Sequence, residues 1–141
     1  MKVVVDTNVI ISALMNVNGT PAKILSLILN GNVKMLYDNR IIFEYYDVLS
    51  RNEFGFPKET VNDMLGYFKH NGEFVNAIFL KRKFIDETDK KFYEVFKFGK
   101  ADYLITGNIK HFPKEDAVII SKDFIQINAS FLCGATKGGA E

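Results

Sequence analysis

Four short apolar runs, separated by segments with helical periodicity, constrain the fold of this 141-residue chain more than any other feature. The runs cover Lys2–Val5, 33–37, 102–106 and 117–120. Because their apolar residues are continuous, these runs predict strands that are buried on both faces, as in a parallel sheet covered by helices. The order strand, helix, strand, helix therefore predicts an α/β protein, a three-layer α/β/α sandwich with a central, mainly parallel sheet.

The segments between these runs carry helix boundary signals. Pro21 stands in the first turn of one predicted helix, Gly31 ends that helix, and Gly99 ends a later one. The stretch 73–80 fits either a helix end or a strand, so both assignments stay open. Helices are predicted within 8–15, 21–29, 38–51, 57–70 and 85–99.

Composition fits one domain over 1–132, followed by a glycine-rich tail at 133–141 that we expect to be disordered. The 18 basic and 17 acidic residues give a net charge of +1, so overall charge indicates no partner. A single cysteine, Cys133, excludes an internal disulfide and a thiolate metal cluster. No uncharged apolar stretch approaches membrane-spanning length, and we expect a soluble, cytoplasmic protein without membrane contact.

Polar side chains follow two of the predicted strands at their carboxyl ends, where parallel sheets form binding sites. Asp6 directly follows the first run, and the loop from Thr106 to Asn108 follows the third. Glu44 borders the apolar stripe of its helix, and Asp89 shares the aromatic stripe of a later helix, so both should face inward. The predicted outward face of that later helix holds Lys90, Lys91, Glu94 and Lys97.

Each acidic residue also has an ordinary explanation. Asp6 suits the N-cap position of the following helix, and Asp89 suits the first turn of its own helix, where a negative charge is favoured. Glu44 has possible partners in Arg40 and Arg51. The predicted convergence of all three acids on one sheet edge favours a shared role instead.

A divalent cation is the simplest way to stabilise such a group of acids. Crowded carboxylates repel one another, and a buried unpaired charge is costly. No histidine or cysteine stands at ligand spacing from the acids, and oxygen-only ligands suit Mg²⁺ or Mn²⁺ better than zinc. Such an ion keeps bound waters, and a metal-activated water is what phosphodiester hydrolysis requires.

Four stretches, in order, carry a family resemblance: "VVVDTNVIISAL", "EYYDVLSRNEF", "DETDKKF" and "ADYLITGNIKHF". Together they resemble the PIN-domain family of metal-dependent nucleases, and within it the VapC-like branch of toxin components of toxin–antitoxin systems. The likeness extends from about Met1 to Phe112, and "VIISKDFI" resembles the usual ending of that branch.

The resemblance implies roles for individual residues. Asp6 corresponds to the first catalytic acid, Glu44 to the helix glutamate and Asp89 to the third acid, and these three would bind the metal. Asn108 falls on a fourth catalytic position that is often aspartate, so this chain has one negative charge fewer there. That change bears on whether a second ion is bound.

Other residues are expected in supporting roles. Asp86 resembles a helix cap or an outer acid, and Asp102 would lie at the amino end of its strand, in a structural role. Residues expected to orient carboxylates or waters are Thr7, Asn8, Ser12 and Thr106. Residues expected to contact RNA phosphates are Arg51, Lys81, Arg82 and Lys83. His70 and His111 are interpreted as solvated or helix-end histidines.

The sequence thus predicts an endoribonuclease that uses Mg²⁺ or Mn²⁺. By resemblance, it would cut single-stranded or structured RNA, form a homodimer and have an antitoxin partner that blocks the site. One alternative is a PIN-like protein that has lost catalysis, as the neutral Asn108 allows, and binds only RNA or a partner. A second is a phospho-acceptor receiver domain, to which Thr106 and Lys122 point, although the chain lacks the paired acids that a receiver has after strand one.

Overall fold

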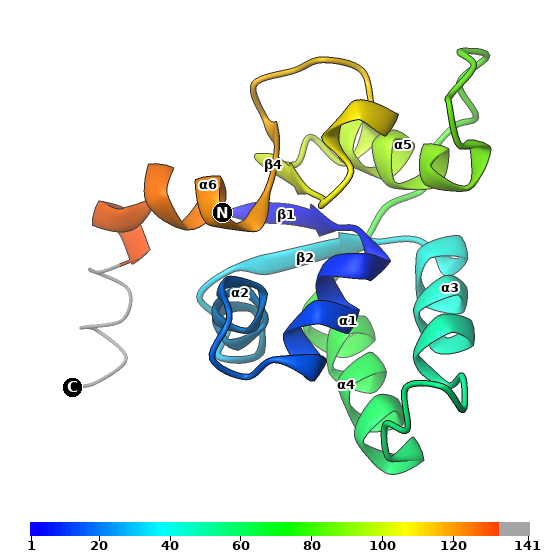
Figure 1. Cartoon of the computed structure of the whole chain (residues 1–141). Helices are drawn as coiled ribbons and strands as arrows, with labels where there is room; N and C mark the ends of the chain where they lie inside the picture. Colours follow the sequence, from blue (N-terminus) through cyan, green and yellow to red (C-terminus); the bar gives the residue numbers. More distant parts are fainter. Residues whose placement is uncertain (133–141) are drawn as a thin grey trace.

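A five-stranded sheet with all its neighbouring strands parallel forms the centre of the protein (Figure 1). The structure is a computed structural model that describes residues 1–132. Its strands are β1 (Lys2–Val5), β2 (Lys34–Tyr37), β3 (Glu73–Phe74), β4 (Tyr103–Ile105) and β5 (Val118–Ile119), in the order β3-β2-β1-β4-β5. The predicted parallel sheet is confirmed. The strand order changes direction between β1 and β4, and in parallel sheets such a switch point leaves a crevice at the carboxyl ends of the two strands.

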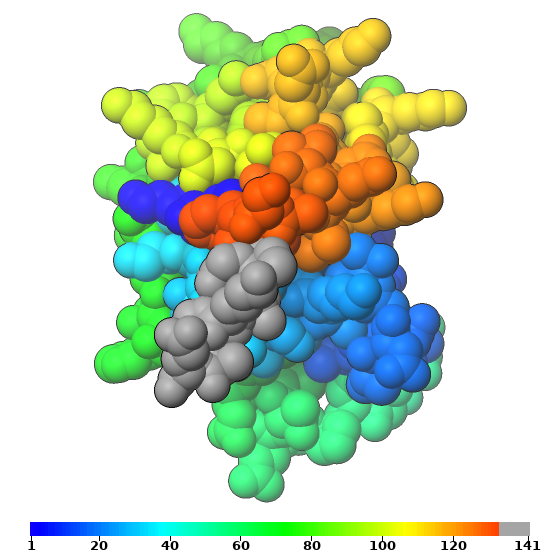
Figure 2. Space-filling view, turned by 90° about the vertical axis from the view of Figure 1, so that its left-hand side faces the viewer, coloured from blue at the N-terminus to red at the C-terminus, as the bar shows by residue number. Residues whose placement is uncertain are grey.

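Helices cover both faces of this sheet, which confirms the three-layer α/β/α architecture. In Figure 1, α1, α2 and α4 lie below the sheet and α5 lies above it, and α6 packs against α2 and β4 at one end (Figures 1 and 2). The helices are α1 (Thr7–Met15), α2 (Thr20–Leu29), α3 (Asn39–Leu49), α4 (Lys58–Asn71), α5 (Lys90–Phe98) and α6 (Ser121–Ile127). There are also two short 3₁₀ helices among the described residues. The first, η1 (Glu87–Asp89), follows the long loop after β3, and the second, η2 (Ile109–His111), follows β4.

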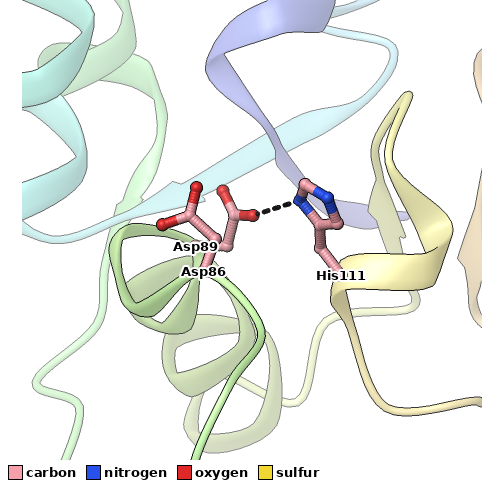
Figure 3. A group of neighbouring side chains, drawn as sticks. All are labelled: Asp86, Asp89 and His111. Carbon is pink, nitrogen blue, oxygen red and sulfur yellow. Dashed lines mark hydrogen bonds and ion pairs between the residues drawn. The ribbon is translucent and has the colours of Figure 1, made fainter.

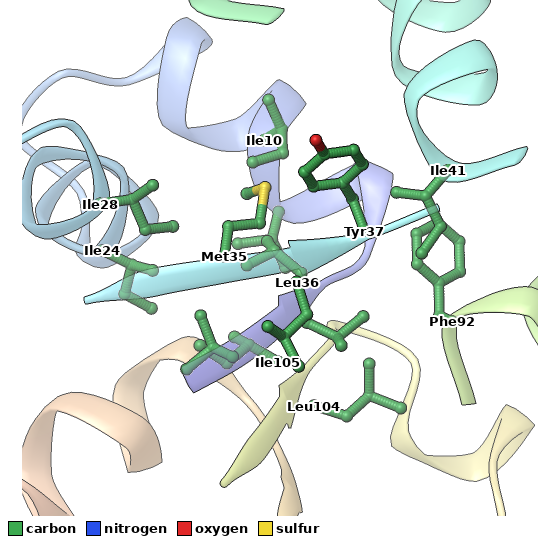
Figure 4. Close-up of a cluster of buried hydrophobic side chains, with 14 of the residues drawn as sticks. Ile10, Ile24, Ile28, Met35, Leu36, Tyr37, Ile41, Phe92, Leu104 and Ile105 are labelled. Atoms are coloured by element: carbon green, nitrogen blue, oxygen red, sulfur yellow. The ribbon is translucent and has the colours of Figure 1, made fainter. Parts of the chain in front are cut away.

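The continuous apolar runs are explained by burial on both faces. Neighbouring side chains of a strand point to opposite faces, yet Met35 and Leu36 on β2 are both fully enclosed (Figure 4). Val3, Val4 and Val5 on β1 are likewise 0% exposed. The rigid centre of the sheet therefore fixes the backbone immediately before Asp6, which follows β1.

The open assignment of 73–80 resolves into a two-residue edge strand followed by irregular chain. β3 pairs with β2, after which Ile78 and Phe79 are largely exposed. This irregular segment is tied down by Glu94 of α5, whose carboxylate accepts a hydrogen bond from the Leu80 backbone N–H at 2.6 Å. The same carboxylate forms an ion pair with Arg40 of α3 at 2.7 Å.

The prediction that Glu94 and Lys91 belong to the outward face of α5 is therefore wrong. Glu94 is only 1% exposed, because Arg40 and the Leu80 amide compensate its charge inside the protein. Lys91 also turns away from open solvent, toward Glu44. Periodicity treats every charged residue as solvent-facing, and it does not detect partners that other elements supply.

No helix in residues 1–132 is both long and apolar enough to cross a membrane. The expected disordered tail at 133–141, with Cys133, lies outside the residues that the structure describes.

Candidate active site

Asp6 stands at the centre of the candidate site, directly after β1. Its backbone N–H donates to the Ile105 carbonyl at 2.9 Å, which continues the pairing of β1 with β4. Its side chain is 3% exposed and accepts a hydrogen bond from the Thr106 hydroxyl at 2.8 Å. Asp6 occupies the N-cap position of α1, where the Asn8 backbone amide lowers the pKa of its carboxylate, but α1 has no side-chain capping hydrogen bond. Capping alone therefore does not explain this acid.

Glu44 reaches the same region from α3. Its carboxylate forms an ion pair with Lys91 Nζ at 2.7 Å and accepts a hydrogen bond from the Thr7 hydroxyl. The arginines suggested as its partners bind elsewhere, since Arg40 pairs with Asp38 and Glu94 and Arg51 pairs with Asp47. Glu44 is thus held at the site by residues of α1 and α5.

Asp89 enters from the start of α5 and is 9% exposed. Its carboxylate lies 3.0 Å from His111 Nδ1 of η2. Figure 3 shows the two side chains pointing toward each other. Asp86 caps η1 by accepting the Thr88 backbone N–H at 2.9 Å, in the capping role expected for it. Within residues 1–132, the ligand atoms of Asp86, Asp89 and His111 all lie within 4.8 Å of one another.

His111 ends the short helix η2, as expected of a solvated or helix-end histidine, but it also contacts Asp89. His111 belongs to η2, in the loop after β4, and this loop carries it to the carboxyl end of the sheet beside Asp89. Although no histidine stands at ligand spacing from the acids in the sequence, the fold brings His111 within 4.8 Å of Asp86 and Asp89. Asp89 and His111 belong to different elements, so no local pattern links them. The one sequence signal for His111 is its position soon after the end of a predicted strand.

Electrostatics show that the three predicted acids influence one another. Burial raises the pKa of Asp6 from 3.8 to about 6, the Thr106 hydrogen bond opposes the rise, and the charges of Asp89 and Glu44 add to it. The pKa of Asp89 is also raised, first by burial and further by Asp86 and Glu44, against the hydrogen bond from His111. The negative charges of Asp6, Glu44 and Asp89 therefore repel one another in each of the three pairs that these residues form.

The same three acids do not form a closed ligand cage. Their oxygens do not all approach within 4.8 Å of one another, because Lys91 and Thr7 hold the carboxylate of Glu44. Asp6 is hydrogen-bonded by a neutral hydroxyl and has no ion-pair partner among residues 1–132. A buried acid whose pKa is raised by burial and by the charges of Asp89 and Glu44 is the kind of side chain that a divalent cation stabilises.

The other predicted residues divide into near and remote groups. Thr7 and Thr106 are buried at the site and bind the acids, whereas Asn8 and Ser12 on α1 are exposed. The Asn108 backbone N–H donates to the Thr106 hydroxyl at 3.0 Å, which places this residue beside Asp6. Asp102 lies at the opposite end of the sheet and accepts a hydrogen bond from the Lys2 backbone N–H at 2.8 Å.

An open pocket adjoins Glu44 and was not predicted from the sequence. Its lining residues are Asn39, Arg40, Phe43, Glu44, Asp47 and Lys91. Phe43 is 72% exposed and offers an aromatic face next to the acids. Among the predicted RNA contacts, Arg51 pairs with Asp47 of this pocket, and Lys81, Arg82 and Lys83 are exposed in the loop before η1.

Replacing Thr106 with valine should weaken metal binding in a pH-dependent way. Valine keeps the shape but removes the hydroxyl that lowers the pKa of Asp6, so a proton competes more strongly with the metal. A Mn²⁺ titration should show affinity reduced about tenfold at pH 6.5, with a smaller loss at pH 8, where Asp6 is ionised in both proteins. Thr60→Val, at an exposed position, is the control. An equal loss at both pH values would contradict this role of Thr106.

Comparison with known proteins agrees with the geometry of this site. The family model of the PIN domain matches residues 2–110, a range that includes Asp6, Glu44, Asp89 and Asn108. The searches of curated proteins and of solved structures gave no significant match. The matched range covers most of the chain, and PIN domains are generally metal-dependent nucleases. The chain therefore belongs to the PIN domain family.

Proposed function

We propose that this protein is an endoribonuclease that requires Mg²⁺ or Mn²⁺. The observation that carries the proposal is Asp6, a buried acid whose pKa is raised to about 6 and which lies beside Asp89 and Glu44 without a cationic partner in the described chain. A divalent cation would relieve this repulsion and, when bound, would supply an activated water and a positive charge for the leaving oxygen.

The residues of the chain would prepare that site. Asp6 and Asp89 would hold the cation, and Glu44 would complete the ligand set or orient a water at the site. Thr106 favours the ionised form of Asp6 by donating a hydrogen bond from its hydroxyl, and His111 fixes the direction of the Asp89 carboxylate. Asn108 contributes a neutral amide that orients water, with its backbone anchored on Thr106.

We further propose single-stranded or structured RNA as the substrate. The open pocket beside Glu44 supports this, because Phe43 offers an exposed aromatic face for an unstacked base. Arg51, Lys81, Arg82 and Lys83 remain the proposed outer phosphate contacts.

The finer biological role rests on the resemblance of four sequence stretches to the VapC-like branch. We propose that residues 1–132 form one catalytic domain, that the protein acts as a cytoplasmic homodimer, and that it is the toxin of a toxin–antitoxin pair. The antitoxin would block the acidic site.

A cleavage assay tests the proposed activity. Labelled RNA is incubated with the wild type, with Asp6→Asn and with Asp63→Asn, a matched change at an exposed position. Cleavage should require Mg²⁺ or Mn²⁺, stop with EDTA, disappear in Asp6→Asn and persist in Asp63→Asn. RNA binding without cleavage under all these conditions would instead identify a PIN domain that has lost catalysis, to which the neutral Asn108 points. Phosphorylation by acetyl phosphate would identify a receiver domain.

A further inference from the structure

Lys91 holds a position that its sequence pattern does not explain. Its side chain is only 14% exposed, and its ammonium group lies 2.7 Å from the Glu44 carboxylate. The same group donates to the Thr88 backbone carbonyl and lies 5.2 Å from the centre of the Phe92 ring. Lys90, the preceding residue on α5, has no such ion pair within residues 1–132. The chain therefore places one particular lysine among the acids of the site.

The charges of the site show what this lysine does. Asp6, Glu44 and Asp89 carry three negative charges when ionised, and Lys91 supplies one positive charge at Glu44. One divalent cation neutralises the remainder. The fourth position of the site is the neutral Asn108. Asp86 adds a further negative charge beside Asp89, where His111 lies within 4.8 Å of both. Lys91 is the cation that pairs with Glu44.

The positions of the side chains, like their charges, favour a single bound cation. Lys91 and Thr7 hold the Glu44 carboxylate, and the oxygens of the three acids do not all come within 4.8 Å of one another. A second ion between Glu44 and its neighbours would have to displace the ammonium group or lie against it. Repulsion between like charges at such short range is strong in a partly buried site.

We infer that Lys91 is a fixed cation that takes the place of a second metal ion, so that this site binds a single divalent cation. The inference rests on the proposed metal-dependent function and adds the number of ions and the residue that sets it. Lys91 is thus a positioning residue that holds Glu44 and limits the charge that the site accepts.

Counting bound Mn²⁺ by electron paramagnetic resonance at pH 7.5 tests this inference without measuring cleavage. The wild-type chain should bind one ion. Lys91→Met should bind the first ion at least about tenfold more tightly, because one positive charge beside the ion is removed. Lys90→Met should behave as the wild type, and Lys91→Arg should retain wild-type affinity because it keeps the charge.

The possible failures of this experiment are distinguishable. Two ions bound to the wild type, or unchanged or weaker binding in Lys91→Met, would overturn the role of Lys91 and leave the proposed nuclease activity in place. Absence of binding to the wild type would overturn both the inference and the metal-dependent function. If Lys91→Met fails to fold, Lys91→Arg decides the matter, since a large change in its Mn²⁺ affinity would contradict a role based on charge.

Discussion

Replacing Asp6 with asparagine should abolish RNA cleavage and at the same time stabilise the protein in the absence of metal. Cleavage should fall at least about 10³-fold, because the change removes a central metal ligand. The stability gain follows from burial and from repulsion by Asp89 and Glu44, which together raise the pKa of Asp6 from 3.8 to about 6. That shift corresponds to an upper limit of about 3 kcal/mol at pH 7.5, and a gain of about 1–3 kcal/mol is expected.

The stability of the metal-free wild type should also depend on pH in a particular direction. The folded protein takes up a proton at Asp6 near pH 6, whereas the unfolded chain does so only near 3.8, so the folded state binds more protons between these values. The contribution of Asp6 to the free energy of unfolding should therefore increase as the pH falls from 7.5 toward 4, and Asp6→Asn should lack this contribution.

Urea denaturation in EDTA, at several pH values, measures both effects. Asp63→Asn, at an exposed position on α4, should change neither the stability at pH 7.5 nor its pH dependence. Adding Mg²⁺ should stabilise the wild type and leave Asp6→Asn unaffected. An Asp6→Asn protein that is less stable than the wild type in EDTA would show that this carboxylate serves the fold and not a metal.

Replacing Glu94 with alanine should destabilise the protein by about 3 kcal/mol. Glu94 is 1% exposed, and its two oxygens bind Arg40 at 2.7 Å and the Leu80 amide at 2.6 Å. Truncation leaves the Leu80 amide without its acceptor, and it leaves Arg40 with Asp38 as its remaining ion-pair partner. It also removes the contact that holds the loop before η1. Since η1 carries Asp89, Mn²⁺ affinity should fall as well.

Urea denaturation and limited proteolysis check this prediction. The Glu94→Ala protein should be cut in the loop 75–86 faster than the wild type, and Glu87→Ala, at an exposed position, should show neither change. A loss of stability below about 1 kcal/mol would mean that the Arg40–Glu94 pair has little net effect, as holds for most exposed ion pairs.

The parts of the fold that rest on continuous apolar runs were predictable. The valines of β1 have to be covered on both faces, and this requirement places Asp6 at the carboxyl end of a central parallel strand. Thr106 follows the neighbouring strand β4, so its contact with Asp6 is a consequence of the same register. These predictions need only local patterns and the geometry of parallel sheets.

The remaining features depend on contacts between distant segments, which a linear pattern does not contain. His111 reaches Asp89 through the path of the loop after β4, and Glu94 becomes buried because Arg40 arrives from another helix. Periodicity places Lys91 on the outward face of α5, but its ion pair with Glu44 brings it into the site. In each case a charged group is turned inward by a partner from a different element.

Anomalous diffraction from crystals grown with Mn²⁺ is the most direct test of the metal site. We predict one strong peak, at about 2.0–2.2 Å from carboxylate oxygens of both Asp6 and Asp89, with the Lys91 ammonium group still at Glu44. A peak held by Asp86 and His111 without Asp6, or no peak at saturating Mn²⁺, would contradict a catalytic metal centre built on Asp6.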